Sequence, residues 1–407
     1  MAEWNWVPLE QLSAPEKSSI SKPYGSAILA SDYRESGVPV VRGVNLADGV
    51  FRDEDFVYID EVLASKMPGA QMRSGDLVVT HRGSVGQVSM VPRRARFDTY
   101  VASTSHVKVR LDPSLAVPEF FYYWFQSGAG RQSLLENVST VGVPGLAQPV
   151  STVKRLRVPA PRLKIQRAIA AILGALDDKI TANRKIVSAC GDLLDAHYTS
   201  ACPVESNETL GDVAAIGGGG TPSTKNDAYW SGDVHWATPT DITGLDGPWL
   251  LDTARTITNA GLEACASPLY PKRSILMTSR ATIGSIALAG VPTAVNQGFI
   301  VVNAKDPHLQ LWLMTQMRAR TAEFLSWSNG ATFLEISRGI FKALPYYSST
   351  PVNLERFNDR AEVLVRRQEA AQRETQVLTR TRNELLPLLM NGKITVKQAE
   401  AKAEEVL

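Results

Sequence analysis

Three short segments of the chain contain residue types that do chemistry in other proteins. The run from Gly217 to Lys225 suggests a phosphate-binding loop, but it lacks the Gly-Lys-Ser/Thr ending, and Pro222 removes a backbone amide. Ser267-Pro-Leu-Tyr270 approaches the Ser/Asn/Asp-Pro-Pro-Tyr motif of amino-methyltransferases without its second proline. Asp177-Asp178-Lys179 is similar to a nuclease carboxylate–lysine arrangement, but it is better explained as the solvated face of a predicted helix. We therefore expect no catalytic residue in this chain.

The cysteines and histidines form no metal-binding pattern. Cys190, Cys202 and Cys265 are scattered and odd in number, which favours free thiols in a reducing compartment. His81 and His235 lack neighbours with metal-ligand spacing, so we expect no metal site. No apolar run reaches the roughly 18 residues of a membrane span, and the N-terminus lacks a signal-peptide pattern. These observations predict a cytoplasmic globular protein.

The net charge of +2 neither requires nor excludes nucleic acid as a partner. A protein that holds DNA alone by its phosphates usually has a larger basic excess. If the chain binds DNA, we expect a partner to supply part of the positive charge.

The strongest pattern in the sequence is a repeat. Residues 74–88 and 272–286 both contain an apolar strand, a Thr, an Arg and, four residues later, a Gly. Arg82 and Gly86 of the first segment match Arg280 and Gly284 of the second at an offset of 198. This offset is too long for a solenoid unit. It indicates a whole domain duplicated in tandem.

The duplication continues along both copies. Four further pairs of segments match: 7–12 with 209–213, 37–45 with 232–241, 101–109 with 294–302, and 142–156 with 330–344. The first of these pairs is predicted to be a short opening strand. Short β-branched runs between turn residues fill each copy, and helices are expected near 117–137 and 307–326. Each copy is therefore predicted to be an α+β domain of about 150 residues.

A long helix is predicted after each copy. Apolar residues recur at spacings of three and four, with Asn183 in the first seam, where a polar residue fixes register. Pro351 suits the start of the second helix, and Gly392 suits its C-terminal cap. Each helix of about 36 residues would be roughly 54 Å long. The residues expected to pair the helices are Ile165, Ile169, Ile172, Leu176, Ile180, Leu364, Leu378 and Leu385.

An exposed seam of this length is unstable in water, so we expect the helices to pair as an antiparallel coiled coil. The two domains, related by approximate two-fold symmetry, would lie at opposite ends of the rod. The alternative is that each helix packs on its own domain. The predicted segments are the domains 1–161 and 203–350, the helices 162–202 and 351–391, and a C-terminal tail, 392–407.

Several short motifs occur in a specific order. The second copy contains Leu210-Gly-Asp-Val213, Gly219-Gly-Thr-Pro-Ser223 and Tyr229-Trp-Ser-Gly232. The first helix contains Gln166-Arg-Ala-Ile-Ala-Ala-Ile-Leu173, and the second helix ends in Leu385-Leu-Pro-Leu-Leu-Met-Asn-Gly-Lys-Ile394. With these motifs in this order, the whole chain resembles the specificity subunit of type I restriction–modification enzymes. Two features depart from the family: Lys164 stands where Glu is frequent, and the second helix begins without a Gln-Arg-Ala-Ile run.

The resemblance implies a subunit that binds double-stranded DNA and does no chemistry itself. Each copy would be a target recognition domain for one half of a bipartite, asymmetric site. The helices would set the spacing and dock two methylation subunits, which use S-adenosylmethionine. Restriction subunits would join them to cleave unmodified DNA. No cofactor is expected on this chain.

Base edges are read by polar side chains in the major groove, and phosphates are contacted by basic and hydroxyl groups. The candidate DNA contacts are Arg42, Asn45, Thr80, His81, Arg82, Gln87, Arg93, Arg94 and Gln148 in the first copy, and Lys225, Thr240, Asp241, Ser279, Arg280, Asn296 and Gln297 in the second. Each has a structural alternative. Arg82 and Arg280 would brace a loop, Asn45 and Asp241 would form turns, and Arg93 and Arg94 would be a solvated turn.

Two other classes of function are left as alternatives. A self-sufficient DNA modification or restriction enzyme would bind S-adenosylmethionine without a partner. A coiled-coil scaffold for proteins would show no DNA affinity even with a methylation subunit present.

Overall fold

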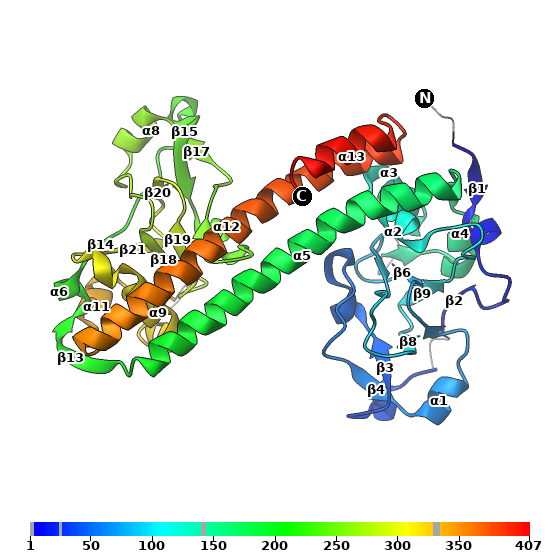
Figure 1. Cartoon of the computed structure of the whole chain (residues 1–407), viewed down its shortest axis with the longest axis horizontal. Helices are drawn as coiled ribbons and strands as arrows, with labels where there is room; N and C mark the ends of the chain where they lie inside the picture. Colours follow the sequence, from blue (N-terminus) through cyan, green and yellow to red (C-terminus); the bar gives the residue numbers. More distant parts are fainter. Residues whose placement is uncertain (1–3, 24–26, 140–143, 329–333) are drawn as a thin grey trace. The chain divides into compact units, whose positions relative to one another are not determined.

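The computed structural model describes residues 4–23, 27–139, 144–328 and 334–407. The chain divides into two compact units. The first unit comprises residues 1–178 and 378–407, and the second comprises residues 179–377. Each unit contains one domain of mixed helices and strands together with a segment of each long helix (Figure 1). The predicted α+β class and the tandem duplication are confirmed.

Two four-stranded sheets form the first domain. The order β2-β9-β6-β7 is antiparallel throughout, whereas β4-β3-β8-β5 contains a parallel pair, β3 and β8. Strands β1 and β12 pair separately and join the two ends of the domain. The strands are β1 Trp6–Pro8, β2 Ile20–Ser21, β3 Val38–Val41, β4 Val57–Ile59, β5 Gln71–Met72, β6 Leu77–Thr80, β7 Val88–Met90, β8 Tyr100–Ala102, β9 His106–Val109, β10 Val138–Ser139, β11 Gly145–Leu146 and β12 Arg157–Pro159. The helices are α1 Glu61–Ser65, α2 Pro118–Gln126, α3 Gly128–Leu135 and α4 Pro149–Arg155.

The second domain has the same plan with two changes at the sheet edges: β16 is added to the larger sheet, and among the described residues the smaller sheet has no strand in the place of β5. Its sheets have the orders β14-β21-β18-β19-β16 and β17-β15-β20, and β13 pairs with β22. The strands are β13 Val204–Thr209, β14 Ala214–Gly217, β15 Trp230–Ala237, β16 Trp249–Leu250, β17 Thr256–Ile257, β18 Ile275–Thr278, β19 Ile286–Ala289, β20 Thr293–Val295, β21 Phe299–Ala304 and β22 Pro345–Ser348. The helices are α6 Leu210–Val213, α7 Pro239–Thr243, α8 Asn259–Ala264, α9 Gln310–Ala319, α10 Thr321–Ser326 and α11 Arg338–Ala343.

The repeated Gly has the same structural role in both copies. Gly86 and Gly284 each have φ 87°, a left-handed conformation that favours glycine. An added Cβ would lie 2.9 Å from Leu135 on α3 in the first copy and 2.4 Å from Thr321 on α10 in the second. The glycine is therefore required by the backbone conformation and by the close approach of a matching helix.

The opening strand of each copy ends earlier in the sequence than expected. β1 ends at Pro8, and Leu9–Leu12 form a 3-10 helix. β13 ends at Thr209, whose amide donates to the Asp212 carboxylate at 2.8 Å, and the Thr209 hydroxyl accepts from the Asp212 amide at 3.3 Å. This reciprocal cap starts helix α6 where the sequence pattern predicted strand. The helices expected near 117–137 and 307–326 are confirmed by α2 and α3 and by α9 and α10.

The two long helices are α5 (Leu163–Ser200) and α12 (Pro351–Met390). Their contacts in the second unit are Asn183–Glu374 at 2.7 Å, Val187–Gln368 at 2.9 Å and His197–Arg360 at 3.2 Å. Rising numbers on α5 meet falling numbers on α12, so the expected antiparallel pairing is confirmed. In the first unit, Arg382 of α12 donates to Asp177 of α5 at 2.9 Å.

The residues predicted to pair the helices differ in burial. The buried members are Ile169, Ile172, Leu176, Ile180, Leu378 and Leu385. Ile165 and Leu364 are half-buried. Next to Leu364, Val365 is fully buried and belongs to the core of the second domain.

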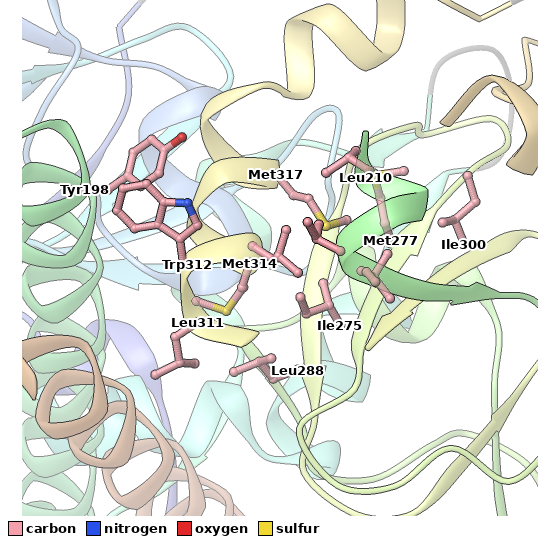
Figure 2. Close-up of a cluster of buried hydrophobic side chains, with 14 of the residues drawn as sticks. Tyr198, Leu210, Ile275, Met277, Leu288, Ile300, Leu311, Trp312, Met314 and Met317 are labelled. Carbon is pink, nitrogen blue, oxygen red and sulfur yellow. The ribbon is translucent and has the colours of Figure 1, made fainter. Parts of the chain in front are cut away.

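In the second unit the long helices also belong to the core of the domain. Tyr198 of α5 and Phe357 of α12 pack with Trp312 of α9, with ring centroids 4.6 Å and 5.1 Å away. Figure 2 shows Tyr198 beside Trp312 and the neighbouring aliphatic residues of this cluster. The sequence left pairing of the long helices and packing on a domain as alternatives. In this unit the long helices do both.

The segment expected to be a C-terminal tail contains helix α13 (Val396–Glu404). Thr395 caps its start, and Ala399 and Ala403 are buried. Across the part of the chain that the structure describes, no helix is both long and apolar enough to cross a membrane.

Candidate nucleic-acid interface

A polar hollow of about 440 Å³ lies in the first domain. Arg42 follows β3, Arg82 and Ser84 lie in the β6–β7 loop, and Ser103 and Thr104 lie between β8 and β9. Because β3 and β8 are parallel neighbours, the segments that follow them leave the same edge of the sheet. The hollow brings together four of the predicted DNA contacts, namely Arg42, Thr80, Arg82 and Gln87.

The lining of the hollow is rich in hydrogen-bond donors. The Nε atom of Arg42 is buried and has no hydrogen-bond partner among the described residues. Arg82 is exposed, and no residue that lines the hollow is acidic. Guanidinium and hydroxyl groups together suit an anion such as a phosphate.

Two buried histidines hold the loop between β8 and β9. The ring Nε2 of His81 lies 3.0 Å from the Thr104 carbonyl oxygen, and the Nδ1 of His106 lies 2.8 Å from the Ser103 hydroxyl. Burial lowers the pKa of both rings, that of His106 to about 4, so both are neutral at physiological pH. His81 was predicted to contact DNA; in the structure its ring is buried and contacts this loop.

Asn45 and Asp241 both form turns through their side chains, as the structural alternative to DNA contact expected. Asn45 is 1% exposed; its side chain accepts from the Arg42 amide at 3.0 Å and donates to the Glu54 carbonyl at 2.8 Å. The Asp241 carboxylate accepts from the Thr238 amide at 2.7 Å and from the Ala254 amide at 2.7 Å. These side chains are occupied by the backbone, which leaves them to shape the loops that carry other residues.

The matching region of the second domain carries a different set of contacts. Arg280 forms an ion pair with Glu335 at 2.9 Å. Asn296 accepts from the Gly298 amide at 2.8 Å, and Gln297 accepts from the Thr221 hydroxyl at 2.6 Å. Ser279, also a predicted DNA contact, is 2% exposed. Lys225 and Thr240 are exposed.

The other predicted contacts of the first domain lie outside the hollow. Arg93 forms an ion pair with Glu119 while most of its side chain stays exposed, and Arg94 is exposed. Gln148 is exposed and begins α4 in a left-handed conformation. Thr80 lines the hollow but is itself only 5% exposed, so little of its side chain is open to a ligand.

The sequence did not predict two features, one in each domain. Tyr33 lines the hollow, although no motif marks it. In the second domain, the Arg255 guanidinium lies 3.6 Å from the centroid of the Trp230 ring, and Trp236 packs edge-on against Trp230. The sequence signal for this cluster was two tryptophans on β15 and the arginine directly before β17.

The residues of the motifs that approached catalytic patterns form hydrogen bonds within the fold. The Ser267 hydroxyl accepts from the Val295 amide at 3.0 Å, and the Tyr270 hydroxyl donates to the Gly218 carbonyl at 2.6 Å. Asp177 accepts from the Tyr123 hydroxyl at 2.9 Å and pairs with Arg382. Within the described ranges, no three His, Cys, Asp or Glu residues are grouped to hold a metal ion.

Comparison with known proteins identifies relatives of the chain. It is 37% identical over 141 residues to the type I restriction enzyme MjaIX specificity subunit of Methanocaldococcus jannaschii, covering 34% of this chain and 33% of that protein. It is 23% identical over 227 residues to the EcoR124I/EcoR124II specificity subunit of Escherichia coli, covering 53% and 54%. The chain thus spans between a third and about half of the length of these relatives.

A solved structure shares the fold over nearly the whole chain. The crystal structure of the type I restriction–modification S subunit from M. genitalium matches with a TM-score of 0.65 and 14% identity, covering 95% of this chain and 96% of that one. Residues 25–188 and 205–345 match the family model of the type I restriction modification DNA specificity domain. Since these matches cover both copies and most of the sequence, the chain belongs to the type I restriction–modification DNA specificity family.

Proposed function

We propose that this chain recognises DNA for a type I restriction–modification complex, with each domain reading one half of a bipartite, asymmetric site. The observation that carries the proposal is a shared backbone with different side chains at matching positions. Ser103 and Thr104 follow β8, whereas Asn296 and Gln297 follow the matching strand, β20. Residues that read base edges must differ if the half-sites differ. Loops of different sequence on a common scaffold meet that requirement.

The long helices serve, in this proposal, as a ruler and as the platform for two methylation subunits. α5 has 38 residues, or about 57 Å at 1.5 Å per residue. That length corresponds to about one and a half turns of DNA at roughly 34–36 Å per turn. The methylation subunits bind S-adenosylmethionine and modify adenine, and restriction subunits cleave, while this chain binds no cofactor and does no chemistry.

Exchange of one domain tests the proposal. Residues 1–161 are replaced by those of a relative with a different target, and the chimaera is expressed with its methylation subunit. Sequencing methylated adenines genome-wide should reveal a site with one half changed and the other retained. The matched control, exchange of residues 203–350, should change only the other half. A target that changes completely, or stays the same in both chimaeras, contradicts the proposal.

Two biochemical measurements separate this function from its alternatives. A self-sufficient modification enzyme would bind S-adenosylmethionine as an isolated chain, which isothermal calorimetry measures directly. A protein scaffold would give no sequence-specific DNA protection when the methylation subunit is added. We expect no cofactor binding by the chain alone and a protected bipartite site with the methylation subunit.

A further inference from the structure

We propose that the hollow of the first domain is a seat for one backbone phosphate of DNA, and that the second domain has no equivalent seat. The inference rests on the proposed DNA-binding function and deepens it. The two domains would then bind the DNA backbone differently: the first holds a phosphate with positively charged side chains, and the second relies on other contacts.

The donors of the seat come from two segments. Arg42 follows β3, and Arg82 and Ser84 lie in the β6–β7 loop. The loop between β8 and β9 also lines the hollow, and neutral His81 and His106 contact this loop and hold it in place. Guanidinium N–H groups and hydroxyls converge on one hollow, and no lining residue carries a carboxylate. A phosphate offers only acceptor oxygens and a negative charge, which matches this lining.

Arg42 supplies the strongest sign that a ligand is expected. Its Nε atom is buried, and the described residues offer it no acceptor. A buried guanidinium N–H without a partner is unfavourable, and such groups in folded proteins nearly always find one. Its backbone amide is fixed by Asn45 at 3.0 Å, so the main chain at Arg42 is held in place. Because Arg42 lines the hollow, a phosphate bound there would offer this donor an acceptor once the side chain shifts to uncover its Nε.

The capping turn identifies which residue of the second domain matches Arg42. In the first domain the amide of Arg42 donates to Asn45, three residues later, and in the second the amide of Thr238 donates to Asp241, also three residues later. Both turns follow the strand that pairs in parallel, β3 or β15. Thr238 therefore stands where the first domain has Arg42, and one of the two guanidinium groups is missing.

In the second domain the other guanidinium group, that of Arg280, is neutralised by a carboxylate. After strands β6 and β18, Arg82 bridges the backbone of Gly145, and Arg280 bridges that of Glu335. Glu335 places its carboxylate 2.9 Å from Arg280. Gly145 has no side chain that could form such an ion pair with Arg82, and the described residues offer Arg82 no other carboxylate partner. The shared arginine is therefore open to an anion in the first copy and occupied in the second.

The salt dependence of DNA binding tests the seat. The full chain with its methylation subunit is titrated with a fluorescent duplex of about 30 base pairs and arbitrary sequence at several salt concentrations. Arg82→Ala and Arg42→Ala should each weaken binding and reduce the slope of log K against log salt by about 0.9, the value for one phosphate. Arg280→Ala, the matched control, should leave the slope unchanged. Arg82→Lys should retain most of it, and Glu335→Gln should increase it by freeing Arg280.

The outcomes distinguish the seat from the function on which it rests. If the wild-type complex binds DNA but Arg42→Ala and Arg82→Ala leave the slope unchanged, the seat is wrong. It is also wrong if these variants alter preference at one base position, since that would mean the hollow reads a base edge. If the wild-type complex binds no DNA, the proposed function fails. Inorganic phosphate then tests the seat alone: it should raise the Tm of the full chain, and raise it less for both variants.

Discussion

Lys108 marks a difference in physical character between the two copies. It lies on β9 opposite Val78 of β6, is fully buried, and its Nζ has no hydrogen-bond partner among the described residues. In the second domain the matching pair is Val301 and Leu276. Burial lowers the pKa of Lys108 from its ordinary value of 10.5 to about 8. A buried amine without a partner costs stability, and the valine of the second copy avoids this cost.

Lys108→Met should stabilise the first unit by about 1–3 kcal/mol at pH 7, because it removes a buried charge while keeping the volume. The sign of the pH dependence follows from the lowered pKa. As pH rises from about 8 towards 10.5, the folded wild type loses the proton before the unfolded chain does, so its stability increases.

Urea unfolding at pH 7 and pH 9.5 measures both effects. The advantage of Lys108→Met should shrink at the higher pH. The exposed Lys17→Met serves as control and should show neither effect. Equal stability of Lys108→Met and wild type at pH 7 would contradict a buried, unpaired amine.

At the scale of elements, each long helix is held to a domain of its own unit by a buried glutamine. Gln166 of α5 accepts from the Val117 amide at 2.8 Å and donates to the Pro161 carbonyl at 2.8 Å. Gln372 of α12 accepts from the Trp249 amide at 3.1 Å and donates to the Trp249 carbonyl at 2.6 Å. The second helix lacks the Gln-Arg-Ala-Ile run of the first, but a glutamine further along makes the same kind of contact.

Gln372→Ala should lower the free energy of unfolding of the second unit by about 2–4 kcal/mol, because it leaves two buried backbone groups of Trp249 unpaired. Hydrogen exchange should report a marked loss of protection at the Trp249 amide, and denaturant unfolding should report the lost stability. Arg367→Ala, on the exposed side of the same helix, should change stability by less than about 0.5 kcal/mol. Unchanged protection at Trp249 would contradict the role of Gln372.

At the scale of the whole molecule, two continuous helices connect two domains of one plan. If the helices are the ruler, their length determines the separation of the half-sites. Inserting one heptad at paired positions of both α5 and α12 adds about 10.5 Å. This corresponds to about three base pairs at roughly 3.4 Å each.

The lengthened chain should therefore methylate a site with the same half-sites and a spacer longer by about three base pairs. Mapping methylated adenines in cells that express this chain with its methylation subunit measures the spacer. A variant with one heptad replaced by a different heptad of the same length is the control and should keep the original spacing. An unchanged spacer in the lengthened chain would mean that another part of the complex sets the distance.

The sequence by itself determined the large-scale features of this protein. The tandem duplication, the α+β class and the two long antiparallel helices follow from local patterns: the repeated Thr–Arg–Gly element, short β-branched runs, and apolar spacings of three and four. These patterns predict the elements correctly because burying one face of a helix or strand requires apolar residues at a regular spacing along that continuous segment. The start of helix α6 was mistaken for strand because its cap depends on one side chain, Asp212.

Only the tertiary structure decided which polar residues are open to a ligand. Asn45, His81 and Asp241 are of types that contact DNA, yet backbone groups far along the chain, such as Ala254 for Asp241, occupy them. Arg82 and Arg280 are identical in the repeat, and Glu335, which distinguishes them, lies 55 residues beyond Arg280. Hydrogen bonds and ion pairs form between segments that folding brings together, so residue type and spacing alone do not specify them.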